Sequence, residues 1–325
     1  MAFSVPSVMV GNRAFLLAVT IGAALTFQVT DAGAAGLGVA QDFNGFVLGD
    51  AALTDATLLN SSTAGRLAVG GNLVASSYGV NTANLPVPPP ALIVGGNLTY
   101  TNGQVNGSAV VGGTASTTGV TFTGGITTSS PVPVDFAAAR SFYELNSTYL
   151  GGLAANGAVT SAFGTLTLTG TNASLNIFTV DGSALASINS YIITAPVGST
   201  VLINVSGANP ILQNAGFTVN GVSQQAVLYN FFEAATLTTS SIGIRGSVLA
   251  PFADVFASNG DLFGTLIAST LQDRGTNQNT LALRNFAFTG DDLQLIPEPS
   301  STGALLLVGL LGSRLARRRS LARHR

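Results

Sequence analysis

Three stretches of the sequence repeat one pattern: RLAVGGNL (66–73), ALIVGGNL (91–98) and SAVVGGT (108–114) each run through aliphatic residues into a Gly-Gly pair. The Gly pairs lie 25 and then 17 residues apart, and RGSVLAP (245–251) matches FGTLIAS (263–269) with an offset of 18. Repeats of this length, with short strands and Gly or Asn at the turns, are typical of a β-solenoid. Each coil of a solenoid buries its apolar face only against its neighbours.

Further short strands with period-2 alternation occupy the second half of the chain. They are TLTLTGT (165–171), LNIFTV (175–180), YIIT (191–194), VLINVSG (201–207), ILQNAGFTVNG (211–221) and VLYNFFEAATL (227–237). A β-sandwich also gives many short strands at such intervals and remains the alternative. The Gly-Gly repeats favour an all-β, right-handed parallel β-helix, in which we expect Gly96 and Gly113 to occupy corners with positive φ.

One segment, residues 134–157, predicts a long α-helix within this β-rich chain. Asp135 is placed to cap its N-terminus after Pro133, and Gly157 to end it. Apolar residues recur at helical spacing; they are Phe136, Ala139, Tyr143, Leu150 and Leu153. At about 1.5 Å per residue such a helix spans several coils, which lie about 4.8 Å apart. We therefore expect it to pack along the side of the β-helix, and PVPPP (86–90) to form an exposed loop.

The composition limits the classes of function. Charged residues make up 8% of the chain, and there is no cysteine. Between Gly36 and Ile296 there are five Arg, no Lys and twelve acidic residues, a net charge of −7. This acidic balance argues against nucleic acid as a partner, because nucleic-acid binding needs a basic surface. We expect one domain over residues 36–292, held together by packing and backbone hydrogen bonds.

Both ends of the chain predict export. Residues 1–35 contain an apolar stretch followed by Ala32-Gly33-Ala34, which fits signal-peptide cleavage. At the other end, in residues 293–325, the uncharged run Pro299–Ser313 would span about 22 Å as a helix, less than the about 30 Å of a bilayer core. The basic residues after it, predicted to remain cytoplasmic, are Arg314, Arg317, Arg318 and Arg319. The body would then lie outside the cytoplasm, after a transient membrane insertion.

The triplet Pro297, Glu298 and Pro299, the short apolar run and the terminal Arg cluster together resemble a PEP-CTERM sorting signal. In that family an exosortase removes the tail of secreted proteins, typically in Gram-negative bacteria that make exopolysaccharide. The resemblance implies the Sec export machinery and an exosortase as partners. It also implies a protein that is anchored in the membrane transiently and then reaches the cell surface or the medium.

The body carries a second resemblance, to the choice-of-anchor A domain. It rests on several blocks in order over about residues 37–290: LGVAQDFNGFVLGD (37–50), the VGGNL repeats, PVDFAAA (133–139), LTGTNASLNIFTVDGS (168–183), VLYNFFEAATL (227–237) and IRGSVLAPFADV (244–255). In that family one extracellular domain is joined to different surface-attachment signals. The resemblance implies a secreted, adhesive or matrix-type β-rich domain, and brings no catalytic motif to any position.

Few residues could carry chemistry. The single histidine, His324, lies in the tail, so Ser-His-Asp and Cys-His catalysis and common zinc sites are excluded from the body. Paired carboxylates remain, since glycosidases use two of them; the candidates are Asp254, Asp261 and Asp273. Four residues could offer oxygens to Ca²⁺ without forming a known loop motif; they are Asp42, Asn44, Asp50 and Asp55. Turn and cap roles are favoured for both sets, and no cofactor or metal is predicted.

These observations favour a non-enzymatic surface or matrix protein, adhesive or associated with exopolysaccharide. The alternative is a carbohydrate-active β-helix enzyme that uses paired Asp residues. A third, more distant possibility comes from the Thr-rich strands 98–101, 121–128 and 165–171, in which Thr occupies alternate positions. If these strands stack, they form a flat hydroxyl-and-methyl surface, as in ice-binding β-solenoids; ordinary β-propensity of Thr is the simpler explanation.

Overall fold

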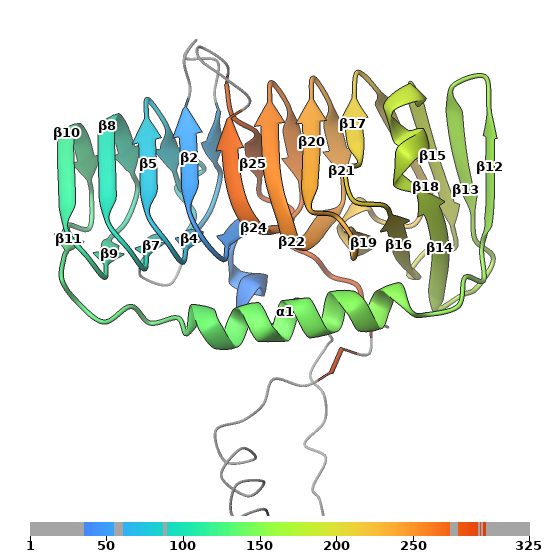
Figure 1. Ribbon diagram of the computed structural model, residues 1–325, viewed down its shortest axis with the longest axis horizontal. Helices are drawn as coiled ribbons and strands as arrows, with labels where there is room; N and C mark the ends of the chain where they lie inside the picture. The colour runs from blue at the N-terminus through green and yellow to red at the C-terminus, as the bar shows by residue number, and fades with distance from the viewer. Residues whose placement is uncertain are drawn as a thin grey trace, which may run out of the picture. The chain divides into compact units, whose positions relative to one another are not determined.

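The computed structural model describes residues 36–54, 61–86, 90–273, 279–291, 293 and 295–296 (Figure 1). These residues form a parallel β-helix, as predicted, and the β-sandwich alternative is wrong: within the large sheet every strand pairing is parallel. A 3₁₀ turn, η1 (Gly38–Asp42), precedes the first coil. Among the described residues, no helix is both long and apolar enough to cross a membrane.

The N-terminal arm of the chain builds four coils in sequence order. Its strands are β1 (Gly45–Val47), β2 (Ala51–Thr54), β3 (Ser62–Thr63), β4 (Leu67–Val69), β5 (Leu73–Ser76), β6 (Gly79–Val80), β7 (Leu92–Val94), β8 (Leu98–Val105), β9 (Ala109–Val111), β10 (Ala115–Phe122) and β11 (Ile126–Thr127). Leu67 pairs with Leu92, and Leu92 with Ala109, so the offsets of 25 and 17 are the true registers.

The α-helix α1 (Phe136–Gly151) then carries the chain back along the stack (Figure 1). Asp135 caps it as predicted, accepting hydrogen bonds from the backbone N–H groups of Ala137 and Ala138. The predicted end at Gly157 is wrong, because α1 ends at Gly151 with Gly152 as its C-cap. Two consecutive glycines disfavour helix strongly enough to end it there.

The C-terminal arm begins at the opposite end of the stack and builds inward. Its elements are β12 (Ala158–Ala162), β13 (Thr165–Thr169), β14 (Leu175–Asp181), η2 (Gly182–Ser187), β15 (Ser190–Ala195), β16 (Thr200–Ser206), β17 (Ile211–Gln213), β18 (Gly216–Gly221), η3 (Gln224–Ala226), β19 (Val227–Asn230), β20 (Thr236–Ser240), β21 (Gly243–Arg245), β22 (Ser247–Ser258), β23 (Asp261–Phe263), β24 (Leu266–Asp273) and β25 (Ala282–Arg284). The predicted strands 211–221 and 227–237 each divide at a turn between two strands. The predicted offset of 18 is confirmed, since Val248 pairs with Leu266.

The two arms meet in the middle of the stack. The first strand, β1, pairs with β4 on one side and with β24 on the other, where Gly45 lies opposite Leu266. Strand β2 likewise pairs with both β5 and β24. The solenoid is therefore discontinuous: its first and last coils are neighbours, and α1 is the connection that makes this order possible.

The Gly-Gly corners exist for a different reason from the one predicted. Gly96 and Gly113 do not have positive φ, so that expectation is wrong. A Cβ added at Gly95 would collide with the carbonyl oxygen of Gly70 in the coil beneath, and one at Gly112 with that of Gly95. Glycine is needed because the backbones of successive coils approach closely at this corner.

The helix α1 covers an apolar column on the outside of the coils. One apolar residue per coil packs beneath it or beneath η1; the set comprises Phe46, Ala68, Ile93, Ile177, Leu202, Leu228, Leu249 and Ile267. The helix contributes Ala139, Tyr143 and Leu150 to this cluster, all buried as predicted from their spacing. The Tyr143 hydroxyl donates to the Leu37 carbonyl at 2.7 Å, which ties α1 to the start of the domain.

Polar contacts fix the C-terminal half of α1. Asn230 and Asn204 occupy adjacent strands beneath the helix, and both are fully buried. The Asn204 amide donates to the Leu150 carbonyl at 2.7 Å. The Asn230 amide donates to the Ser147 carbonyl and to Asn204 Oδ1, both at 2.9 Å, and Ser147 Oγ donates to Asn230 Oδ1 at 2.6 Å. Both asparagines bond to the helix backbone, so they hold α1 at one position on the stack.

Candidate functional site

One side of the stack forms a long row of outward-facing side chains, here called the front face. It consists of strands β10, β8, β5, β2, β24, β22, β20 and β17, in that spatial order (Figure 1). Eight strands at about 4.8 Å spacing give a row on the order of 35 Å long. Both arms of the chain contribute to it.

A column of polar residues, here called the polar ladder, runs along the front face. Its members are Thr236, Asp254, Thr270, Asp50, Asn72, Asn97 and Thr114. Thr236, Asp254 and Thr270 lie directly opposite one another in β20, β22 and β24. The other four each precede a strand whose first residue is in register with its neighbours, so they continue the same column.

Hydrogen bonds connect successive members of the polar ladder. Asp50 Oδ1 accepts from the Asn72 N–H at 2.6 Å, and Asn72 Oδ1 accepts from the Asn97 N–H at 2.9 Å. Asn97 Oδ1 accepts from both the N–H and the hydroxyl of Thr114. On the other arm, Thr270 Oγ1 donates to Asp254 Oδ1 at 2.8 Å. In these four steps the side chain of one coil satisfies a group of the next coil, whereas Thr236 Oγ1 donates to Asn209 Oδ1 at 2.9 Å.

A second column on the front face mixes small polar and apolar residues. In spatial order it reads Ile211, Thr238, Phe256, Gln272, Ala52, Val74, Thr99 and Ser116, each directly opposite the next. Val74 is 53% exposed, although it is a large apolar residue. The front face therefore offers hydrogen-bonding groups beside shallow apolar contacts over its whole length.

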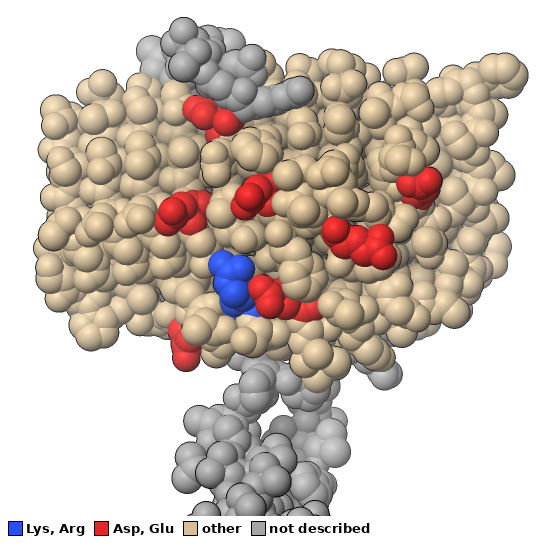
Figure 2. Space-filling view, in the orientation of Figure 1, with Lys and Arg blue, Asp and Glu red and all other residues tan. Residues whose placement is uncertain are grey.

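Charge on the front face is sparse and mostly acidic (Figure 2). The half built by β5, β8 and β10 carries none, because residues 67–134 contain no Asp, Glu, Lys or Arg. A surface with so little charge recognises a partner through hydrogen bonds and apolar contact rather than through electrostatic attraction.

The predicted carboxylate pair does not come together. Asp254 lies on the front face, whereas Asp261 lies in a separate row formed by β21, β23 and β25. Asp261 accepts from Arg284 Nε at 2.6 Å, so each carboxylate has its own structural partner. Asp273 ends β24 opposite Ala257. The structure brings no two of these three side chains into contact.

The residues considered for Ca²⁺ are also separated. Asp50 belongs to the polar ladder, and the Asn44 amide is buried, donating to the Arg284 carbonyl at 3.0 Å. Asp42 Oδ2 lies 3.8 Å from Arg66. Asp55 falls outside the described residues, as do Ala32, Ala34, Pro297, Glu298, Pro299 and the Arg cluster 314–319. Within the described part of the chain, no three His, Cys, Asp or Glu side chains gather as metal ligands would.

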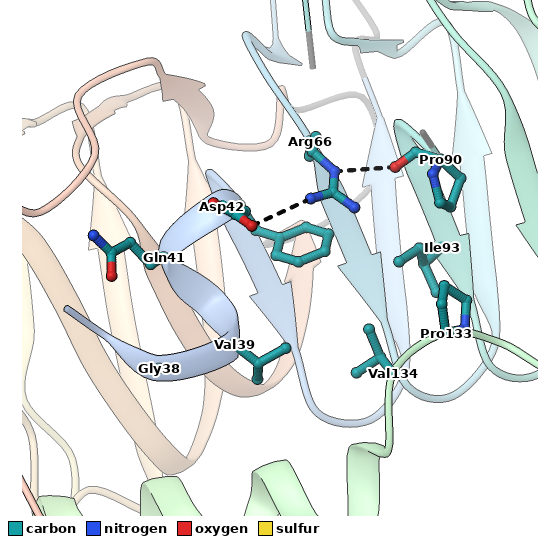
Figure 3. Close-up of a pocket in the computed structure, with 10 residues that line it drawn as sticks. Gly38, Val39, Gln41, Asp42, Arg66, Pro90, Ile93, Pro133 and Val134 are labelled. Atoms are coloured by element: carbon teal, nitrogen blue, oxygen red, sulfur yellow. Dashed lines mark hydrogen bonds and ion pairs between the residues drawn. The ribbon is translucent and has the colours of Figure 1, made fainter. Parts of the chain in front are cut away.

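A pocket that sequence reasoning missed surrounds Arg66, between η1 and the segment leading into α1 (Figure 3). Its volume is about 350 Å³. The guanidinium is largely buried, lies 4.2 Å from the centre of the Phe43 ring, and donates from Nε to the Pro90 carbonyl at 3.0 Å. Burial lowers the pKa of Arg66, and the nearby Asp42 partly offsets this. Arg66 thereby holds Pro90, the last residue of the proline-rich loop. In the sequence, Arg66 stands out only because the 68 residues that follow it (67–134) carry no charge.

The Thr-rich strands do not form one surface. Thr99 and Thr101 lie on β8 in the large sheet, whereas Thr165, Thr167 and Thr169 lie on β13 in a separate four-stranded sheet of β12, β13, β15 and β18. Residues 121–128 lie in β10 and β11 of the large sheet, as 98–101 do, but 165–171 do not, so the three strands do not stack into the one flat surface that ice binding would need. Their common sequence pattern reflects an exposed β-strand face, which recurs on different sides of a solenoid.

Residues 36–279 match the protein family described as "Putative Ice-binding-like adhesive domain". The chain belongs to this family. The match spans the four coils of the N-terminal arm, α1 and the C-terminal arm through β24, which is the whole discontinuous stack apart from β25. Membership supports an adhesive protein of the cell surface. No curated protein matches the chain.

Proposed function

We propose that this adhesive domain is a non-enzymatic module of the cell surface that binds a neutral polysaccharide, such as an exopolysaccharide, through the front face. The observation that carries the proposal is the polar ladder, which continues without a break across both arms of the chain. A repeated row of hydroxyl and amide groups matches a polymer that presents the same groups at each repeat. Each contact is weak, and affinity arises from their number.

Two further features support a neutral polymer. The front face has few charges and those are mainly acidic, so a polyanion would gain no attraction there (Figure 2). Val74 and Phe256 in the second column provide apolar contact beside the hydrogen-bonding groups. Sugar rings present both hydroxyl edges and apolar C–H faces, and the two columns together offer both kinds of contact.

The binding assay uses the chain retained on beads coated with the host's own exopolysaccharide. Thr99→Glu and Thr238→Glu add bulk and charge at two points of the second column, one from each arm. Thr218→Glu, on the separate four-stranded sheet, is the matched control. We expect retention to fall about tenfold for each of the two front-face variants, which equals about 1.4 kcal/mol of binding free energy. Retention of the control variant should not change. Equal retention by all three proteins would refute the proposal.

The same preparation tests the enzyme alternative. Reducing-end release is measured on the bound polymer, with Asp254→Asn and Asp261→Asn as the informative variants. Product formation that either substitution abolishes would replace the adhesive module by a carbohydrate-active enzyme. We expect retention of polymer without release.

We further propose that export and processing follow the terminal segments. The Sec machinery would export the chain, residues 293–325 would hold it in the membrane transiently, and an exosortase would cut near Pro297, Glu298 and Pro299. Intact-mass analysis of the surface or released protein tests this route. A mature protein that keeps Met1 or the Arg-rich tail would contradict it.

Ice binding is a second candidate, favoured by the separate four-stranded sheet. Its outer side carries Thr160, Thr167 and Thr218 in one register and Thr169 and Thr194 in the next. Ile192 and Asn220 interrupt the hydroxyl array at the same registers. Partition of the protein into slowly growing ice, compared between the native chain and Thr167→Lys, tests this candidate; exclusion of the native chain from ice would reject it.

A further inference from the structure

The two ends of the stack are finished differently. At one end, β12 turns back and pairs antiparallel with β13, so the edge strand there is the short, fully exposed β12. At the other end, β10 pairs in parallel with β8, and no other described strand lies along its outer edge. The backbone N–H and C=O groups on that outer edge are therefore available along two extended runs, 115–118 and 120–122, which Gly119 with φ +66° separates.

The open end also leaves part of the core half covered. Ala115, Val120 and Phe122 of β10 pack against the buried cluster, yet all three are only partly buried. The corresponding side chains one coil deeper, Leu98 and Val105, are buried completely. Another layer of strand on β10 would complete their burial, which is favourable by about 25 cal/mol per Å² of apolar surface.

The usual protections of an edge strand are missing from β10. Natural proteins guard exposed edges with charged residues, proline or a bulge. Strand β10 has no charged residue and no proline, and it pairs with β8 in the same register on both sides of Gly119. The absence of charge extends over residues 67–134, so this end of the stack contains no group that would repel a like surface (Figure 2).

We propose that β10 is a self-association edge, at which two copies of this chain pair end to end through antiparallel β10 strands. A second copy is the occupant that these features fit best. It presents the same cross-section and the same uncharged surface, and one two-fold contact covers both open edges and both sets of half-covered core residues at once. Pairing of β10 with β12 of another copy would instead generate an open filament, and β12 offers only five residues.

Association of the full chain is measured by sedimentation in a mild detergent, with Thr117→Lys as the disruptive variant. Thr117 is exposed at the open end, so lysine places a charge at the edge. Thr99→Lys adds the same charge to β8, one coil deeper. We expect a dimer for the native chain and for Thr99→Lys, and a dimer weakened about tenfold or more for Thr117→Lys.

Cross-linking provides a second readout that does not depend on the folding of a lysine variant. The chain has no cysteine, so Thr118→Cys introduces a single thiol on β10, and Thr99→Cys is its control on β8. We expect mild oxidation to give a covalent dimer of Thr118→Cys and to leave Thr99→Cys monomeric. A monomeric native chain, filaments in place of dimers, or equal cross-linking of both variants would overturn the proposal.

Discussion

Replacing Asn230 by alanine should destabilise the domain far more than removing an exposed amide of the polar ladder. Asn230 is fully buried and takes part in three side-chain hydrogen bonds, to the Ser147 carbonyl, the Ser147 hydroxyl and Asn204 Oδ1. These bonds join α1 to two adjacent strands of the C-terminal arm. The substitution leaves the backbone pairing of β19 intact, so it isolates the contribution of the side chain.

The expected cost follows from the groups that lose their partner. Asn204 Oδ1 loses the Asn230 amide as its donor and stays buried, at a cost of about 1–3 kcal/mol. The Ser147 hydroxyl loses its acceptor but can turn toward a carbonyl of its own helix, which reduces its penalty. The cavity left by the missing amide adds a further cost. In total, we expect Asn230→Ala to lower the free energy of unfolding by about 3 kcal/mol.

Urea unfolding followed by far-UV circular dichroism measures this change, because the chain has no tryptophan to report on unfolding. Asn72→Ala is the control: it removes one hydrogen bond at an exposed corner, where water can replace it, and should cost about 0.5–1 kcal/mol. The double variant with Ser147→Ala should cost less than the sum of the two single variants, with a coupling of about 1–2 kcal/mol. A loss below that of the control, or additive effects in the double variant, would refute the reasoning.

Three further outcomes are expected. Gly95→Val should prevent folding or lower the free energy of unfolding by at least about 3 kcal/mol, because the added Cβ collides with the Gly70 carbonyl oxygen. Thr99→Val should leave stability nearly unchanged. Soluble yield and thermal melting compare the two variants. Phe163→Asn should stabilise the β12–β13 hairpin by about 0.5–1 kcal/mol, because Phe163 is fully exposed at φ +49° and asparagine tolerates that region; a lower melting temperature would show that the ring is needed. Burial raises the pKa of Tyr229 well above its ordinary value, so as pH rises this tyrosine ionises first in the unfolded chain. The free energy of unfolding should therefore fall above about pH 10, which urea titrations at neutral and alkaline pH measure. Tyr229→Phe should weaken this pH dependence of stability.

The register of the coils was predictable because the same local chemistry recurs at each corner. Each of the three Gly-Gly pairs in the repeats marks a place where the backbones of successive coils touch, so the spacing of these pairs gives the register directly. The physical reason why glycine is required at these corners was not predictable in the same way. Close backbone approach and positive φ both require glycine, and the sequence contains nothing that distinguishes them.

The order of the coils could not be read from the sequence. A solenoid coil contacts only its two neighbours, and every coil presents a similar apolar face, so any coil can stack on any other as far as composition shows. The pairing of Gly45 with Leu266 leaves no mark in either segment. The buried asparagines were a usable sign, however. Asparagine is depleted in strands, so Asn204 and Asn230 within otherwise apolar strands indicate a backbone that needs donors nearby.

The proposed binding surface exists only when both arms of the chain are in place. The polar ladder passes from Thr270 of the last coil to Asp50 of the first, at the junction where β24 pairs with β1 and β2. That junction joins segments at opposite ends of the domain, and contacts of this kind form late because closing a long loop is entropically costly. Either arm alone presents only half of the row. Because binding to a polymer depends on the number of simultaneous contacts, a half-length row would lose far more than half of the affinity. In the proposed binding mode, the discontinuous order therefore makes adhesion depend on the junction between the first and last coils, a contact that a solenoid built in simple sequence order does not contain.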